Sequence, residues 1–475
     1  MKPWPDSMVN RRDILKLAAL FTDIACPWPV AAAARPKRVI IAGAGLAGLS
    51  CAWELSKRGH DVVVLEASNR IGGHVRTIRE GLADGLYADG GAEHFTRPGY
   101  ELYRSYVKEF DLPVLAYPHR ENILKVVDGR MVSEQEAVAL RTLKASGYNQ
   151  REIDYITKKH SRDLTELYLG RYIEKIRDEY QPFGVGLDRL DEYSVTDLLY
   201  QEGASAAAIR SIGSDDSALH SIWAEAIVRL RGLPSDPHEL YRLKGGNQAL
   251  PDAFAARLES CIRKNCPVTH IQYGDTGITV TCSQDRGTQR FQGDYLVCSM
   301  NAIILRQIHI DPPWPDAKRF AIENMPYTVE TRPILQSRTK FWERDGYSGN
   351  MEFGSPILGP LWPMAEDVPT NRGLLIGTGQ ASAPADAAVR LFQRYYPGKS
   401  ADIDHIMTID WSQDKWAMGC QASDYRPGQL RKFWPATIQP VGRVYFAGAY
   451  CDNLNWGMEA ATRSAYRVAL GIHEA

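Results

Sequence analysis

The chain has 475 residues, which is long enough to form large hydrophobic cores and more than one domain. Its 44% hydrophobic and 24% charged residues are typical of a globular protein, and its formal net charge of -1 indicates neither a nucleic acid nor an anionic membrane as partner. The eight cysteines match no zinc-binding spacing, so we expect no metal site.

Residues 1–35 predict an export signal. Arg11 and Arg12 precede an apolar run that ends near Phe21, and the small residues of 31–34 follow. This order resembles a twin-arginine signal with its cleavage region. The apolar run is too short to span a bilayer, so we expect no membrane anchor. The alternative is a disordered basic tail, which would leave the protein in the cytoplasm.

The stretch from Arg38 to Glu66 predicts a βαβ unit that binds a dinucleotide. An apolar strand leads into Gly43, Gly45 and Gly48 at the GxGxxG spacing, a helix follows, and a second strand ends at Glu66. The glycines let the backbone approach a pyrophosphate, whose charge the helix N-terminus stabilises. Glu66 is placed to accept hydrogen bonds from an adenosine ribose.

A second glycine motif follows the βαβ unit, with Arg70 ahead of Gly72 and Gly73. This run resembles the second flavin motif of the monoamine oxidase and L-amino acid oxidase superfamily. In that family an arginine follows the paired glycines, whereas this chain has His74. The resemblance therefore implies that Arg70 or Arg76 neutralises the phosphate charge instead.

The rest of the chain extends the resemblance in the family's motif order. Residues 245–251 resemble its GGN-x-x-L-P turn, and the run DWSQDKWAMG at 410–419 is closer to L-amino acid oxidases than to monoamine oxidases. A strand and turn end at Gly448, and Gly457 and Met458 open the last helix. The N–H groups of that helix are expected to face the pyrimidine edge of a flavin and stabilise the charge formed on reduction.

The resemblance implies that FAD is the cofactor. Its contacts are expected from Gly43, Gly45, Leu46, Ala47, Gly48, Glu66, Ala67, Arg70, Gly72, Gly73, His74, Gly91, Ala92, Val268, Gly448, Gly457 and Met458. Non-covalent binding is expected. The alternative is a thioether from Cys420, which lies eight positions before Gly428 and so matches the spacing of the flavin-linked cysteine of monoamine oxidases from a Pro-Gly turn.

The expected fold is α/β: a Rossmann-like FAD-binding domain built from discontinuous segments, with a mixed-sheet substrate domain and a helical insertion. The FAD-binding domain would consist of residues 36–105, 240–305 and 405–475. The substrate domain would consist of residues 106–130 and 306–404, and the helical insertion of residues 131–239. Within the helical insertion, Ser194 is expected to begin a helix, with Asp197 three positions later.

The resemblance implies oxidative deamination of L-amino acids by FAD and dioxygen, which yields a 2-oxo acid, ammonia and hydrogen peroxide. The candidate catalytic residues are Glu93, His94, Arg332 and Trp456. Arg332 stands where the family has a lysine, and a guanidinium binds a carboxylate or a water but is no base at neutral pH. Arg97 is a second candidate for binding the substrate carboxylate, and Trp456 precedes Gly457 where the family has a glycine followed by an aromatic residue.

Several alternatives stay open at this point. One is a monoamine or polyamine oxidase on the same scaffold, since Glu93 would suit an acidic tunnel. Another is a dehydrogenase that reduces a quinone. A non-catalytic binding module is disfavoured, because Glu66 and the 446–448 turn are both present. Trp362, Trp416 and Trp434 are further candidates for the walls of a substrate site, and a homo-oligomer remains an option.

Overall fold

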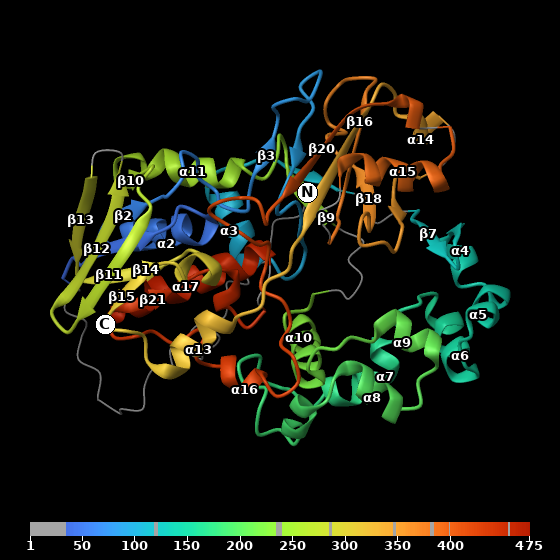
Figure 1. Ribbon diagram of the computed structural model, residues 1–475, viewed down its shortest axis with the longest axis horizontal. Coiled ribbons are helices and arrows are strands. Elements are labelled where there is room, and N and C mark those ends of the chain that lie inside the picture. Colours follow the sequence, from blue (N-terminus) through green and yellow to red (C-terminus); the bar gives the residue numbers. More distant parts are fainter. Residues whose placement is uncertain are drawn as a thin grey trace, which may run out of the picture.

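The computed structural model describes residues 35–117, 122–233, 240–284, 287–344, 348–380, 384–398, 400–454 and 457–475. The expected export signal therefore lies outside the described residues except for Arg35, and so does Trp456. Within the described part of the chain, no helix is both long and apolar enough to cross a membrane. Two sheet-containing lobes and a group of helices make up the molecule (Figure 1).

A five-stranded parallel sheet forms the centre of the first lobe. Its strands are, in spatial order, β10 (Ile262–Arg263), β2 (Asp61–Leu65), β1 (Arg38–Ala42), β14 (Tyr295–Cys298) and β21 (Val444–Phe446). These strands come from three sequence segments that lie far apart in the chain, 38–65, 262–298 and 444–446. The expected Rossmann-like sheet from discontinuous segments is confirmed.

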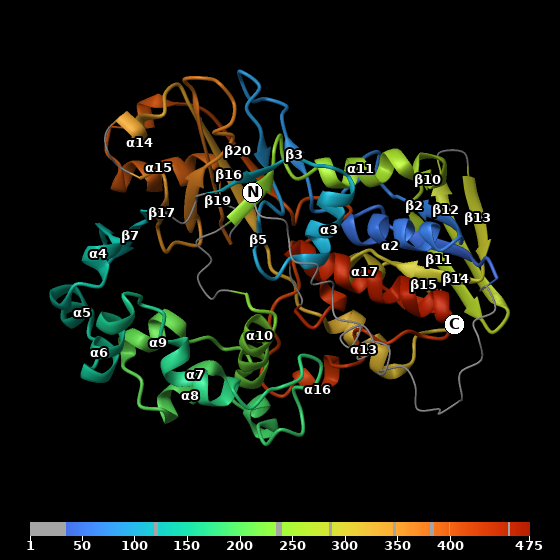
Figure 2. The same cartoon turned by 180° about the vertical axis from the view of Figure 1, so that it is seen from behind.

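Both faces of this sheet are covered, which explains the continuous apolar sequence of β1. Val39 and Ile41 pack towards helices, whereas Ile40 and Ala42 pack into the core on the other side. The helices on the first face are α2 (Leu46–Lys57), α3 (Glu101–Glu109), α11 (Ala249–Arg257) and α17 (Gly457–Glu474), with α2 and α17 side by side in both views (Figures 1 and 2).

A four-stranded sheet covers the second face. It consists of β13 (Gly287–Gly293), β12 (Gly277–Gln284), β11 (Val268–Gly274) and β15 (His309–Asp311). The expected alternating strands at 268–271 and 278–280 are thus β11 and β12, which pair antiparallel. Helices α12 (Ala302–Leu305) and α13 (Asp316–Asn324) follow in the same lobe.

The second lobe is a seven-stranded mixed sheet. Its order is β20 (Ile403–Asp410), β16 (Thr331–Ser337), β19 (Gly373–Gly377), β18 (Pro360–Pro363), β17 (Met351–Glu352), β7 (Leu124–Val127) and β8 (Arg130–Ser133). Helices α14 (Phe341–Arg344) and α15 (Ala385–Tyr395) cover one face. The opposite face, with Ile334, Ile376 and Trp362, packs on residues 86–88 of the first lobe.

Short strands connect the two lobes. They are β3 (Thr77–Ile78) with β4 (Ala88–Asp89), and β5 (Phe95–Thr96) with β9 (Leu240–Leu243) and β6 (Val114–Ala116). The division into three domains stays a prediction. Within it, the boundary at 405 falls inside β20, which pairs with β16, and residues 309–311 pair with β11 rather than with the second lobe.

The helical insertion forms a separate group, which is drawn below the seven-stranded sheet in Figure 1. Its helices are α4 (Glu134–Ala137), α5 (Leu140–Ser146), α6 (Gln150–Lys159), α7 (Thr165–Ile173), α8 (Val195–Gln201), α9 (Ala206–Ile212) and α10 (Ala218–Leu230), and α16 (Leu430–Phe433) lies against them. The expected helix start at Ser194 is confirmed, because Ser194 and Asp197 form a reciprocal capping box.

A buried ionic network joins this helical group to the C-terminal segment. Arg231, directly after α10, donates from Nε to Glu179 Oε2 at 2.7 Å and from Nη2 to Asp452 Oδ1 at 3.0 Å. Arg463 of α17 also donates to Glu179, at 2.9 Å. Burial raises the pKa of Glu179, but the two arginines outweigh it and lower that pKa to about 2. The network thus fixes the segment before α17 to the insertion.

We expect Arg231→Met to lower the free energy of unfolding by about 3–5 kcal/mol, because it leaves a buried ion partly uncompensated. The side chain of Asp452 is 0% exposed and that of Arg231 is 7% exposed. Chemical denaturation measures the change. Arg319→Met is the matched control, since Arg319 forms an exposed pair with Asp316 and should change the free energy by less than about 0.5 kcal/mol. Equal effects of both substitutions would contradict the role of the network.

The turn between β1 and α2 leaves no room for a side chain at Gly48. A Cβ atom there would lie 2.0 Å from Gly43 O and 2.6 Å from Ser299 Oγ. At Gly45, in contrast, the nearest atom would be Gly73 Cα at 3.8 Å, and the backbone φ of −72° suits any residue.

We therefore expect Gly48→Ala to lower the free energy of unfolding by about 1–3 kcal/mol through overpacking. Gly45→Ala, the matched control, should stay within about 0.5 kcal/mol of the parent protein. Denaturant titration of both variants checks this. A stable Gly48→Ala variant would show that the turn is looser than its geometry indicates.

Candidate functional site

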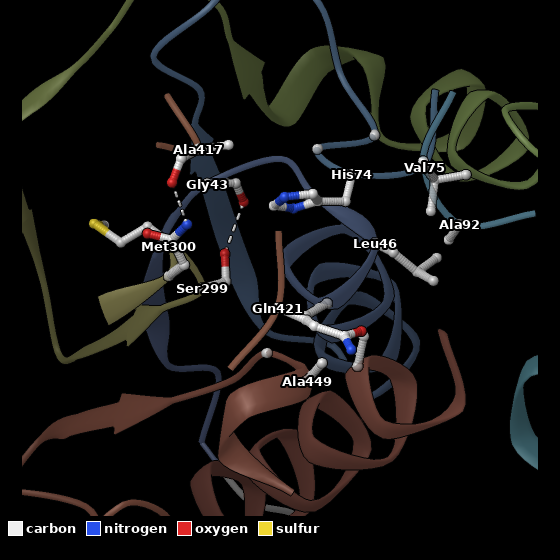
Figure 3. Close-up of a pocket in the computed structure, with 18 of the residues that line it drawn as sticks. Gly43, Leu46, His74, Val75, Ala92, Ser299, Met300, Ala417, Gln421 and Ala449 are labelled. Carbon is white, nitrogen blue, oxygen red and sulfur yellow. Dashed lines mark hydrogen bonds between the residues drawn. The ribbon is translucent and has the colours of Figure 1, made fainter. Parts of the chain in front are cut away.

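A cavity of about 370 Å³ opens at the carboxyl edge of the five-stranded sheet. The residue or turn that follows each of four strands lines it: Gly43 after β1, Glu66 after β2, Ser299 after β14 and Gly448 after β21. Parallel α/β sheets bind ligands at this edge. Figure 3 shows the wall near Gly43, where Ser299 Oγ donates to Gly43 O at 2.9 Å.

The N-terminus of α2 points its backbone at this cavity. Gly45 is the N-cap, no side chain caps the helix, and the first turn contains no acidic residue. Leu46 and Ala47 line the cavity beside it. The first N–H groups of α2 thus have no side-chain acceptor, and the helix dipole favours an anion there. This end of the cavity fits a pyrophosphate.

Glu66 lies where the adenosine ribose is expected. Its Oε2 accepts from Ala44 N and its Oε1 accepts from Ser68 N, both at 2.8 Å. These bonds hold the carboxylate at the cavity wall, next to Ala67 and opposite Val268 at the start of β11. The arrangement fits the nucleoside half of FAD.

The second glycine motif packs directly against the first. Gly72 N donates to Ala44 O at 2.8 Å, and Gly45 forms a β-bridge with Gly72. Both Gly72 and Gly73 have positive φ values, of 99° and 57°, which favour glycine. The two motifs therefore form one backbone cradle for the phosphates.

His74 does not take over the charge of the arginine that the family has at this position. It is half-buried, its Nε2 lies 2.8 Å from Gly419 O, and its ring is tilted against Trp411, with 4.4 Å between the ring centroids. Burial lowers the pKa of His74, so the ring is neutral. Arg70 lines the cavity and pairs with Asp414 at 3.2 Å. Arg70 thus places a positive charge in the cavity wall, whereas Arg76 does not line the cavity.

The far end of the cavity is formed by the start of α17. Gly457 has a φ of 86°, and a Cβ atom there would lie 2.8 Å from Tyr100 Oη. Met458 and Tyr450 line the wall beside it. Gly448 N donates to Ser464 Oγ at 2.9 Å, which ties the turn after β21 to α17. This end presents a helix N-terminus where the flavin ring is expected.

Three predicted catalytic residues come together beyond that end. Glu93 Oε1 lies 3.3 Å from His94 Nδ1, and Glu93 Oε2 lies 3.9 Å from Arg332 Nη1. Glu330 Oε2 is 4.0 Å from Arg332 Nη2. Burial would lower the pKa of Arg332, but Glu93 and Glu330 raise it above its usual value, so Arg332 stays charged.

Arg332 also lies at the junction of two cavities. Glu93, His94 and Arg332 line both the large cavity and a second one of about 190 Å³. The side chain of Arg332 is 12% exposed, and its buried Nη1 atom has no hydrogen-bond partner among the described residues. A buried guanidinium N–H of this kind fits an anionic group of a ligand.

The structure brings almost all predicted site residues to the large cavity. Among the described residues that were expected to contact FAD, only Gly48 does not line it, because it packs against Gly43 inside the turn. Trp362 lines the second cavity and Trp416 the first, whereas Trp434 is buried against Trp223 in the helical group. Arg97 lines neither cavity.

The cavity wall also contains residues that were not predicted, and two of them, Glu330 and Tyr450, lie close to the other site residues. Glu330 directly precedes β16 and stands two positions before Arg332, a spacing that in extended backbone places both side chains on one face and so offers a signal. Tyr450 follows the position where the family has a glutamate, and no local pattern in the sequence indicates its role.

Cys420 lines the cavity as a neutral thiol. Burial and the neighbouring Glu330 raise its pKa to about 12, and Arg332 offsets only part of this rise. A thiol that stays protonated is a poor nucleophile.

Similar proteins agree with this site. The curated relatives include the L-amino-acid oxidase of Demansia vestigiata, 27% identical over 469 residues that cover 93% of this chain and 87% of the relative. L-amino-acid oxidase BmooLAAO-I of Bothrops moojeni is 27% identical and covers 93% of this chain and 90% of its own length.

Solved structures share the fold at lower identity. Cyclohexylamine oxidase from Brevibacterium oxydans IH-35A has a TM-score of 0.77 at 22% identity, over 92% of this chain and 99% of its own. A putrescine oxidase triple mutant has the same TM-score and identity, over 92% and 98%.

A family model, described as flavin containing amine oxidoreductase, matches residues 46–473. The match includes the helix after the GxGxxG glycines, the strand with Arg332 and almost all of the last helix, and each of these contributes residues to the large cavity. The chain is therefore a member of the flavin-containing amine oxidoreductase family, and its cofactor is a flavin.

Proposed function

We propose that the protein is an FAD-dependent L-amino acid oxidase that forms 2-oxo acids, ammonia and hydrogen peroxide. The observation that carries the proposal is Arg332, a buried cation with a hydrogen-bond donor to spare at the junction between the two cavities. A simple amine has no group that needs such a cation. The names of the curated relatives support the same choice.

Bound FAD would accept the hydride from the substrate Cα and pass the electrons to dioxygen. The chain's own residues bind and orient. The glycine cradle and the N-terminus of α2 hold the pyrophosphate, Glu66 holds the ribose, and Arg332 binds the substrate carboxylate. His94 and Glu93 lie beside the same position, where they accept hydrogen bonds from the substrate amine, and the apolar walls limit access of water.

An amine oxidase is the second candidate, and Glu93 favours it. Its carboxylate lies 3.9 Å from Arg332, which weakens the attraction of that guanidinium for a substrate carboxylate. The neighbours of known structure are named for putrescine and cyclohexylamine oxidation. Their identity of about 22% supports the fold and leaves the substrate open.

Peroxide release from a panel of L-amino acids, D-amino acids and amines tests the proposal. We expect peroxide with L-amino acids only, and Arg332→Met should lower kcat/KM for them by at least about 100-fold, since a bidentate charged contact is lost. Flavin absorbance of the variant serves as the control for cofactor binding. Peroxide with amines but not with amino acids would overturn the proposal, and flavin reduction without peroxide would indicate a dehydrogenase.

We further propose that the FAD is bound non-covalently, because the Cys420 thiol is protonated at neutral pH. Acid precipitation should release all of the yellow colour into the supernatant, and Cys420→Ala should hold the same amount of flavin as the parent protein. Colour that stays in the pellet of the parent and leaves it in Cys420→Ala would show a thioether instead.

Export by the twin-arginine route also belongs to this proposal. That route carries proteins that are already folded around a cofactor, which suits a flavin enzyme. The motif at 11–12 supports it, although it lies outside the described residues. A homo-oligomer stays an open expectation.

A further inference from the structure

The second cavity runs away from the flavin cavity along the face of the seven-stranded sheet. Besides the residues that it shares with the large cavity, it is lined by Ile123, Asn350, Met351, Glu352, Pro360, Leu361, Trp362 and Thr378. Two apolar side chains in its wall, Ile123 and Trp362, are buried. The cavity thus joins the Arg332 end to a distal end at β17.

One row of residues crosses the sheet beneath this cavity. The register of β16 with β19 places Arg332 opposite Thr378, whose N donates to Pro360 O at 3.0 Å. Pro360 pairs with Glu352, and Glu352 pairs with Lys125 on β7. Residues opposite each other on neighbouring strands share a face. The row therefore presents a cation, a hydroxyl, an apolar ring, a carboxylate and a second cation in this order.

The two charged ends of the cavity are well separated. Three strand spacings of about 4.8 Å put the backbones of Arg332 and Glu352 roughly 14 Å apart. This is farther than either side chain reaches, so a ligand that contacts both must supply an extended chain between them. The apolar walls suit an aliphatic chain.

Glu352 is able to accept a ligand cation. Its present partner is Lys125 Nζ at 3.4 Å, and their side chains are 39% and 32% exposed. An ion pair this exposed is weak because solvent screens it, so a ligand cation that is held in place by the rest of the cavity can replace Lys125.

We propose that this cavity binds the substrate side chain and that Glu352 selects side chains that end in a cation, so that the preferred substrates are basic L-amino acids. The proposal rests on the proposed function, since it needs a carboxylate at Arg332. Beyond that function, it assigns a specificity role to Glu352, with Lys125 competing with the substrate cation for the Glu352 carboxylate.

The test compares L-lysine with its uncharged analogue L-norleucine in peroxide release. We expect Glu352→Gln to lower kcat/KM for L-lysine by about 10-fold while L-norleucine changes by less than about 2-fold. Lys125→Met is the matched control of opposite sign. It frees the carboxylate, so kcat/KM for L-lysine should rise while that for L-norleucine stays the same.

Equal losses for both substrates in Glu352→Gln, or no loss for either, would overturn the proposal, as would a fall for L-lysine in Lys125→Met. Failure of the proposed function can be told apart from failure of this proposal, because the parent protein would then oxidise amines but not amino acids. In that case the pair cadaverine and pentylamine replaces L-lysine and L-norleucine. The role of Glu352 as a cation selector then holds if Glu352→Gln lowers only cadaverine oxidation, and fails otherwise.

Discussion

The positive end of helix α2 at the edge of a parallel sheet is the interaction on which the site depends. A helix N-terminus without a side-chain cap attracts an anion, and the glycines before it let the ligand approach the backbone. Other segments that line the large cavity contact the β1–α2 turn or helix α2 itself. Gly72 bonds to Ala44, Ser299 bonds to Gly43, and α17 packs along α2. The sheet thus acts as a rigid frame on which separate segments of the chain meet.

The reacting end is built on the other lobe, and its charges are balanced within it. Arg332 comes from the seven-stranded sheet and Glu93 from the connection between the lobes. Glu93 is buried and raises the pKa of Arg332, so it stabilises the charged form of that guanidinium. Arg332 is a permanent cation, so in the proposed function position 332 serves binding rather than proton transfer. The same sheet continues under the second cavity, which links substrate choice to its register.

The helical insertion contributes through the segment that precedes α17. Asp452 is held between Arg231 and Arg463, while Tyr450, two residues earlier, lines the flavin cavity. A buried network of this kind keeps its geometry because each ion would be costly to leave unpaired. The insertion therefore supports the site from outside it, because none of its described residues lies in the cavity wall.

The sequence by itself determined the nucleotide half of the site, because glycines, a strand and a terminal acid at fixed spacing leave the backbone few options. It also indicated most cavity residues, including Arg70, Gly457 and Arg332, since they lie in contiguous motifs. The tertiary structure decided those features of the site that depend on contacts between segments far apart in the chain. It placed Arg70 rather than Arg76 in the wall, brought Glu330 and Glu93 to Arg332, and aligned Glu352 with Arg332 across four strands. Strand order and register set these contacts, and neither is encoded within a single motif.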